Sequence, residues 1–113
     1  MKKVVDKRPW GGFEQFTFNE ISTVKILTVK PKSRFSLQYH KKREEFWRVL
    51  EGPVKITIGK MTIRAKEGEE VLIPKKTLHR AQALTKTAKI LEISFGKFDE
   101  NDIVRVEDDY GRV

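Results

Sequence analysis

At 113 residues the chain is the size of one domain, which argues against separate cofactor and substrate lobes. A hydrophobic content of 38% is enough for a packed core and argues against disorder, while 35% charged residues and a net charge of +8 indicate a charged, basic exterior. The absence of cysteine excludes disulfides, thiolate metal sites and a cysteine nucleophile, and it suits the reducing cytoplasm, where we expect this protein.

Short β-branched and aromatic runs, separated by glycine, proline and asparagine, dominate residues 13–95. This pattern is typical of an antiparallel sandwich or barrel. The hairpin turns are predicted at residues 19–20 and 59–60, because asparagine and glycine tolerate a positive φ. The predicted strands, in chain order, are Phe13–Phe18, Ser22–Val29, Phe35–His40, Glu45–Glu51, Val54–Ile58, Met61–Ala65, Glu70–Ile73, His79–Ala83 and Lys89–Phe95.

The pattern changes after Gly96. Residues 99–102 read Asp-Glu-Asn-Asp, a cluster that resembles the N-terminal cap of a helix, so we expect a single helical turn there, followed by a tail. No internal repeat or linker interrupts the chain. Residues 1–113 are therefore predicted to form one all-β domain with a short C-terminal helical turn.

The two histidines of the chain lie near other possible metal ligands. Gln38 and His40 are two apart on a predicted strand, so their side chains share a face. Glu45 begins the next strand, and the short connection can bring it opposite His40. His79 begins a later strand, and a closed barrel would add its imidazole as a fourth ligand. Neutral imidazoles with oxygen donors suit a divalent Zn, Mn, Fe, Co or Ni ion.

The spacing of these residues resembles the paired motifs of the cupin superfamily. Gln38 begins a run Gln-x-His-x4-Glu, and Gly68 begins a run Gly-x5-Pro-x4-His. The resemblance implies a cupin barrel, that is, a jelly roll or double-stranded β-helix. The chain departs from the superfamily pattern at four positions, where cupins have Gly, His, Gly and Asn: Lys32, Gln38, Lys76 and Ala83.

A narrower resemblance covers nearly the whole chain. Residues 36–47, Ser-Leu-Gln-Tyr-His-Lys-Lys-Arg-Glu-Glu-Phe-Trp, are similar to the run Ser-Leu-Gln-x-His-x2-Arg-x-Glu-x-Trp of the C-terminal domain of type II phosphomannose isomerases. Residues 8–11 and 102–112 resemble the opening and closing landmarks of the same family. The resemblance implies a metal-dependent enzyme that interconverts mannose 6-phosphate and fructose 6-phosphate through an enediolate. Guanylyltransferase activity, found in many relatives with a further domain, is not expected, because the chain has no glycine-rich nucleotide loop.

Aldose–ketose isomerisation needs a polarised carbonyl and a base that moves a proton between adjacent carbons. Glu92 is the candidate base, because it matches an acidic position of the family and alternates with Ile90 and Ser94 toward the predicted interior. The alternative is an outward Glu92 paired with a lysine. Arg43 matches the arginine of the family and is expected to stabilise the enediolate or to bind phosphate.

The resemblance also implies substrate-binding residues. Arg8, Lys25 and Arg105 match basic positions of the family and are candidates to bind the phosphate, although each could equally be a surface cation. Trp47 is expected at the substrate pocket or in the core. The alternative function is a non-catalytic cupin that binds a sugar phosphate or sugar nucleotide, which the departures from the superfamily pattern leave open.

Three expectations concern partners. Nucleic acid is not expected, because the basic residues are scattered and do not interleave with aromatic residues on one strand face. A membrane is not expected either, since no apolar run is long enough to span one. A homodimer is predicted, because Phe35, Leu37 and Tyr39 are expected to point away from the ligands and to form an apolar outward row.

Overall fold

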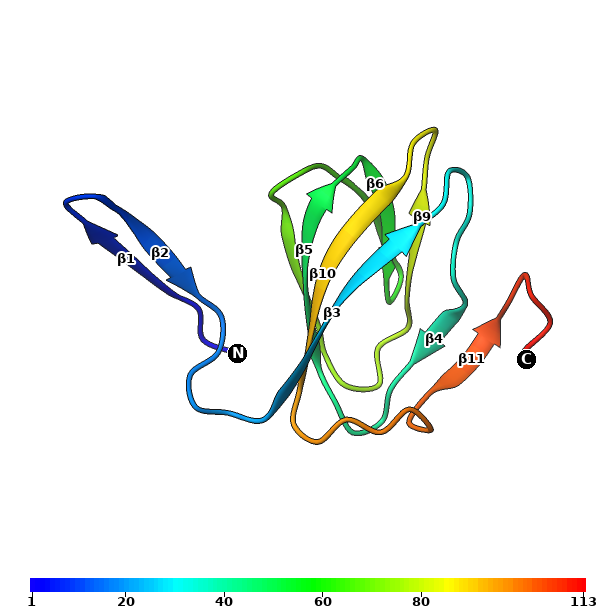
Figure 1. The fold of residues 1–113 in the computed structure, drawn as a ribbon. Helices are drawn as coiled ribbons and strands as arrows, with labels where there is room; N and C mark the ends of the chain where they lie inside the picture. Colours follow the sequence, from blue (N-terminus) through cyan, green and yellow to red (C-terminus); the bar gives the residue numbers. More distant parts are fainter.

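A computed structural model describes all 113 residues and contains eleven strands and no helix (Figure 1). The prediction of an all-β chain is therefore confirmed. None of its segments is a helix with the length and apolar character needed to cross a membrane. The strands are β1 (Val4–Arg8), β2 (Gly11–Gln15), β3 (Ser22–Val29), β4 (Leu37–Tyr39), β5 (Glu45–Glu51), β6 (Val54–Ile58), β7 (Met61–Ala65), β8 (Glu70–Ile73), β9 (His79–Ala83), β10 (Ala88–Phe95) and β11 (Val104–Glu107).

Two antiparallel sheets face each other and enclose the core (Figure 1). One has the strand order β3-β10-β5-β8, and the other has the order β11-β4-β9-β6-β7. Eleven buried apolar residues form the core cluster, and both sheets contribute to it, for example through Trp47 on β5 and Ile56 on β6. The β1–β2 hairpin belongs to neither sheet.

Side-chain alternation on β5 and β10 follows the predicted faces. On β5, Glu45, Trp47 and Val49 are each no more than 2% exposed. On β10, Glu92 lies opposite Trp47 in the pairing of the two strands, and its side chain is buried. The outward alternative for Glu92 is therefore wrong, since this carboxyl group points into the molecule.

Most predicted strands have the bounds read from the sequence. These bounds are confirmed for β3, β5, β6, β7, β8 and β9. The turn at Gly59, which has a φ of 59°, joins the paired strands β6 and β7 as predicted. Asn19 also has a positive φ, of 49°, but it connects strands of different sheets, so residues 19–20 do not form a hairpin turn.

The N-terminal hairpin differs from the prediction. The expected strand Phe13–Phe18 is shifted to β2, which pairs with an unpredicted strand β1. Strand β2 begins with two glycines, Gly11 and Gly12, a pair that is more typical of a turn than of a strand. A Cβ at Gly12 would collide with the backbone oxygen of Asp6 across the hairpin, so glycine is required there.

The hairpin projects from the barrel and is attached at its base (Figure 1). The ring of Phe16, just after β2, packs on Phe46 of β5 with ring centroids 5.2 Å apart. The Lys3 ammonium lies 2.9 Å from a carboxylate oxygen of Glu70 on β8. These contacts cover part of the outer face of the four-stranded sheet.

At the predicted C-terminal helical turn the structure has one hydrogen-bonded turn and no helix, and the predicted tail contains a strand. The backbone N–H of Asp102 donates to the backbone oxygen of Asp99 at 3.1 Å, which closes a single turn, but no helix follows. The carboxylate of Asp102 binds a distant loop instead of capping a helix. The β-branched residues that come next form β11, which pairs with β4.

The predicted outward row is also wrong for Phe35. Strand β4 begins at Leu37, so the alternation does not extend back to Phe35. The Phe35 ring packs edge-on against Trp47, with centroids 5.8 Å apart and an interplanar angle of 81°. Leu37 and Tyr39 are half-buried. The homodimer stays a prediction, without this row as its reason.

Candidate metal centre and cavity

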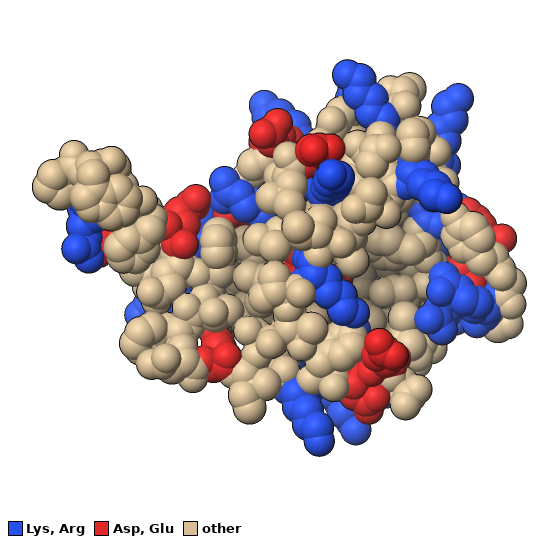
Figure 2. Space-filling model, in the orientation of Figure 1, with Lys and Arg blue, Asp and Glu red and all other residues tan.

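A cavity of about 680 Å³ lies between the two sheets, a size usual for small-molecule sites. The face in Figure 2 is hollowed between β3 and β11, and basic side chains lie on both sides of the hollow. Most of the residues expected at a site line the cavity: Lys25, Gln38, His40, Arg43, Glu45, Glu92 and Arg105.

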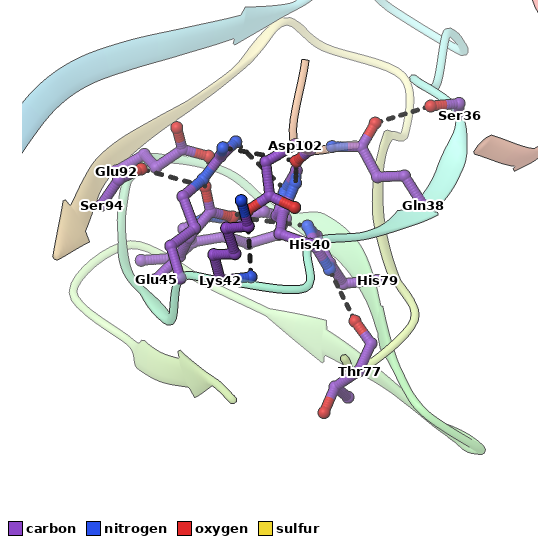
Figure 3. Close-up of polar contacts among 12 residues, drawn as sticks. Ser36, Gln38, His40, Lys42, Glu45, Thr77, His79, Glu92, Ser94 and Asp102 are labelled. Atoms are coloured by element: carbon purple, nitrogen blue, oxygen red, sulfur yellow. Dashed lines mark hydrogen bonds and ion pairs between the residues drawn. The ribbon is translucent and has the colours of Figure 1, made fainter. Parts of the chain in front are cut away.

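Three of the four predicted metal ligands converge in this region. His40 follows β4, Glu45 begins β5 and His79 begins β9, so both sheets contribute. All three side chains are buried, and one ligand atom from each lies within 4.8 Å of the others. Glu45 Oε1 is 3.6 Å from His40 Nε2 and 3.4 Å from His79 Nε2 (Figure 3).

The backbone fixes the orientation of both imidazoles. His40 Nδ1 lies 2.7 Å from the backbone oxygen of Asp102, and His79 Nδ1 lies 2.9 Å from that of Thr77. A carbonyl oxygen only accepts hydrogen bonds, so each Nδ1 carries the proton. Each Nε2 therefore presents a lone pair to the centre, which is how histidine binds a metal when its other nitrogen is held by the protein.

Two of the three converging ligand atoms lack hydrogen-bond partners. Glu45 Oε1 and His79 Nε2 are buried and have no hydrogen bond. Burial would by itself raise the pKa of Glu45, whereas a proton shared with the imidazoles of His40 and His79 lowers it, and a metal cation between the same atoms would favour the carboxylate in the same way. Buried acceptors that face one another are costly unless a cation joins them. The residues present therefore fit a divalent metal ion bound by nitrogen and oxygen.

Gln38 lies beside this centre. It pairs with His79 across β4 and β9, and its side chain lines the cavity. Its amide oxygen accepts a hydrogen bond of 2.6 Å from the Ser36 hydroxyl (Figure 3). An oxygen held in this way keeps a second lone pair. The role of Gln38 as fourth ligand stays a prediction.

Arg43 contacts both the centre and the cavity wall. Its Nε donates to Glu45 Oε2 at 3.2 Å, and its Nη2 lies 3.4 Å from His40 Nε2. Its Nη1 donates to the backbone oxygen of Asp99 at 3.1 Å, and its guanidinium lies 4.5 Å from the centroid of the Phe98 ring. The guanidinium is thus fixed on several sides while still lining the cavity.

Glu92 is a buried carboxyl group in the same cavity. Burial raises its pKa, and the negative charge of Glu45 raises it further. The hydrogen bond that Trp47 Nε1 donates to Glu92 Oε2 at 3.1 Å, with the charges of Lys25 and Arg43, opposes this rise only in part. A carboxylate with a raised pKa is a better base near neutral pH.

The four predicted substrate-binding residues lie in different places. Lys25 and Arg105 line the cavity, and Arg105 Nε is buried without a hydrogen-bond partner. Trp47 is a core residue whose indole packs edge-on against His79. Arg8 lies far along the projecting hairpin, half exposed and paired with Asp6 at 3.0 Å. The structure does not bring Arg8 to the other site residues.

Asp102 is a site residue that the sequence did not reveal. It binds the loop that carries His40 and Arg43. Burial would raise the pKa of its carboxyl group, but the N–H groups of Lys41 and Lys42 lower it, so the group is ionised. The acidic cluster around it was a signal, although it resembled a helix cap and gave no indication of this distant contact.

The sequence is similar to known proteins over almost its full length. Residues 2–108 match the family described as mannose-6-phosphate isomerase C-terminal. The xanthan biosynthesis protein XanB of Xanthomonas campestris pv. campestris is 36% identical over 107 residues, and a mannose-1-phosphate guanylyltransferase of Salmonella montevideo is 39% identical over 107 residues. Both alignments cover 93% of this chain, which spans only 23% of the length of either relative.

The fold is also similar to solved structures. A protein with a double-stranded β-helix domain from Klebsiella pneumoniae superposes with a TM-score of 0.68. The sequences are 15% identical, and the match covers 82% of this chain and 80% of that one. The expected cupin barrel is therefore confirmed.

Proposed function

Because the chain belongs to the mannose-6-phosphate isomerase C-terminal family, we propose that it is a metal-dependent isomerase that interconverts mannose 6-phosphate and fructose 6-phosphate. The observation that carries the proposal is one group of residues in and beside the cavity. It combines three converging ligand atoms, an arginine in contact with them, and a second buried carboxyl group with a raised pKa. These are the groups that proton transfer next to a carbonyl requires.

His40, Glu45 and His79 would hold a divalent cation, for which Zn, Mn, Fe, Co and Ni are the candidates, and Gln38 would be the fourth ligand. When bound, the cation supplies Lewis-acid polarisation of the carbonyl of the open-chain sugar. The unpartnered atoms of Glu45 and His79 support this assignment.

Glu92 is proposed as the base. It would take the proton from C2 of the aldose and return it to C1, while a hydroxyl proton passes from O2 to O1, so the reaction is balanced without a co-reactant. The raised pKa of Glu92 supports the role. A base must accept a proton and then release it, and a carboxyl group does both more readily when its pKa is closer to neutral pH. Trp47 would orient the carboxyl group through its hydrogen bond.

Arg43 is proposed to stabilise the negative charge of the enediolate. A planar guanidinium that is already held by Glu45 and by a backbone oxygen needs little reorganisation when that charge develops. Lys25 and Arg105 are proposed to bind the phosphate. Neither has a carboxylate partner within salt-bridge distance, whereas Arg112, which also lines the cavity, is paired with Asp108 at 2.7 Å.

The proposal is tested by turnover. Protein incubated with each divalent metal in turn should convert mannose 6-phosphate, with fructose 6-phosphate detected by a coupled assay. Mannose 1-phosphate with GTP should give no GDP-mannose, since no guanylyltransferase activity is expected. Binding of mannose 6-phosphate without turnover under every metal would contradict the isomerase and support the non-catalytic sugar-phosphate binder.

A further inference from the structure

Asp102 contacts four consecutive residues of the loop that joins β4 to β5, two of which, His40 and Lys42, are labelled in Figure 3. Its two carboxylate oxygens accept hydrogen bonds from the backbone N–H groups of Lys41 at 2.8 Å and Lys42 at 3.0 Å. Its backbone oxygen accepts one from His40 Nδ1 at 2.7 Å and a longer one from Arg43 Nη1 at 3.5 Å. One residue therefore binds both functional side chains of the loop and the backbone between them.

The loop depends on this contact. Strand β4 ends at Tyr39 and β5 begins at Glu45, so the N–H groups of Lys41 and Lys42 have no partner in either sheet. Backbone donors need a partner or water, and a carboxylate that accepts two of them makes stronger bonds than a neutral group would. The carboxylate of Asp102 thereby fixes where its own backbone oxygen lies relative to the His40 ring.

We propose that Asp102 is a positioning residue, whose carboxylate holds the loop so that the His40 ring and the Arg43 guanidinium are set in one geometry. The proposal rests on the function proposed above, because it takes His40 as a ligand and Arg43 as the group that stabilises the enediolate. Asp102 acts only through these two residues, since it does not line the cavity itself.

Two substitutions at Asp102 distinguish the effect of its carboxylate from the effect of its backbone oxygen. Asp102→Ala keeps the backbone oxygen but removes its anchor. Asp102→Asn keeps one acceptor and turns an NH₂ group toward the second N–H, so its effect is expected to be intermediate. Asp108→Ala is the matched control, because Asp108 also accepts hydrogen bonds from two backbone N–H groups, those of Tyr110 and Arg112, but it lies outside this loop.

The experiment measures Co²⁺ affinity by competition with a chelator, then kcat and KM for mannose 6-phosphate, and Tm of the metal-free protein. Asp102→Ala should weaken Co²⁺ binding about tenfold to hundredfold, the usual effect of losing a residue that orients a metal ligand. It should also lower kcat with KM nearly unchanged, whereas Asp108→Ala should leave Co²⁺ affinity within about twofold. Wild-type Co²⁺ affinity and kcat in Asp102→Ala would overturn the proposal. It would also be overturned if both variants lost Co²⁺ affinity equally and in proportion to a fall in Tm.

Failure of the proposed function is distinguishable from failure of this inference. If the wild-type protein binds no Co²⁺ and turns over no mannose 6-phosphate, the proposed function is wrong. The positioning of His40 is then decided by ¹⁵N NMR of the imidazoles in the metal-free protein. One Nδ1-protonated tautomer in the wild type and a mixture in Asp102→Ala would support the proposal, and identical spectra would overturn it.

Discussion

Glu45 Oε1 and His79 Nε2 lie 3.4 Å apart, both buried and both without a hydrogen-bond donor. Two acceptors held this close repel each other unless a proton or a metal cation lies between them. The pair joins strands of opposite sheets, since Glu45 begins β5 and His79 begins β9. The free energy of this contact therefore depends on what the cavity binds.

Divalent metal should stabilise the protein through this contact. Co²⁺ at a hundredfold excess over its Kd contributes about 2.7 kcal/mol, which corresponds to a rise in Tm of about 10 °C for a domain of this size. Glu45→Gln keeps the shape but removes the charge, so most of the rise should disappear in calorimetry. Glu51→Gln, an exposed change on the same strand, is the control. An equal rise in Tm for Glu45→Gln would contradict the metal centre.

Arg43→Lys should lower kcat and kcat/KM together, by about a hundredfold or more, while metal content and Tm stay near wild type. The reason is that lysine keeps the charge but loses the planar donor group that is fixed by Glu45 and Asp99. Steady-state kinetics measures the effect, with Arg48→Lys on the outer face of β5 as the control. An effect on KM alone would mean that Arg43 binds the substrate phosphate in the ground state.

The raised pKa of Glu92 predicts a pH dependence of stability. Folding favours the protonated form, so the contribution of Glu92 is full below the pKa of the unfolded chain and is lost as the pH rises through the higher folded pKa. Glutamine has no proton to lose, so Glu92→Gln should have a higher free energy of unfolding than the wild type at neutral pH, both measured without metal. The difference between the two proteins should be smaller at acid pH. Urea unfolding at several pH values measures it. Parallel curves for the two proteins would show that the Glu92 pKa is not raised.

Arg105→Gln should weaken binding of mannose 6-phosphate about tenfold or more and leave binding of unphosphorylated mannose unchanged, because an arginine–phosphate contact is charge-assisted and bidentate. Calorimetric titration measures both ligands. Arg64→Gln makes the same change at an exposed position on β7, and it should bind mannose 6-phosphate as wild type does. If Arg105→Gln also binds like wild type, the phosphate lies elsewhere in the cavity.

The strands and the first ligands could be predicted because their signals are local. Period-two alternation assigned the inward face of β5, and the short spacing between His40 and Glu45 brought these ligands together across one connection. His79 needed the additional assumption that the barrel closes. The strand pattern left a sandwich and a barrel both open, and the cupin resemblance favoured the barrel.

The parts that could not be predicted depend on distant contacts. The side chain of Asp102 binds N–H groups about sixty residues away, and such a carboxylate has the same sequence pattern as a helix cap. Arg8 was expected at the substrate, but the position of the projecting hairpin decides where it lies. Phe35 turned inward because the strand begins two residues later than its pattern indicates.

The ligands of the proposed centre belong to both sheets, with Glu45 on one and His79 on the other. A bound cation would therefore act as a cross-link between the two layers, and separating the sheets would require its release. Amide hydrogen exchange of β5 and β9 should slow by a common factor when Co²⁺ is added. The β1–β2 hairpin pairs with neither sheet, so its amides should exchange at the same rate with or without the metal.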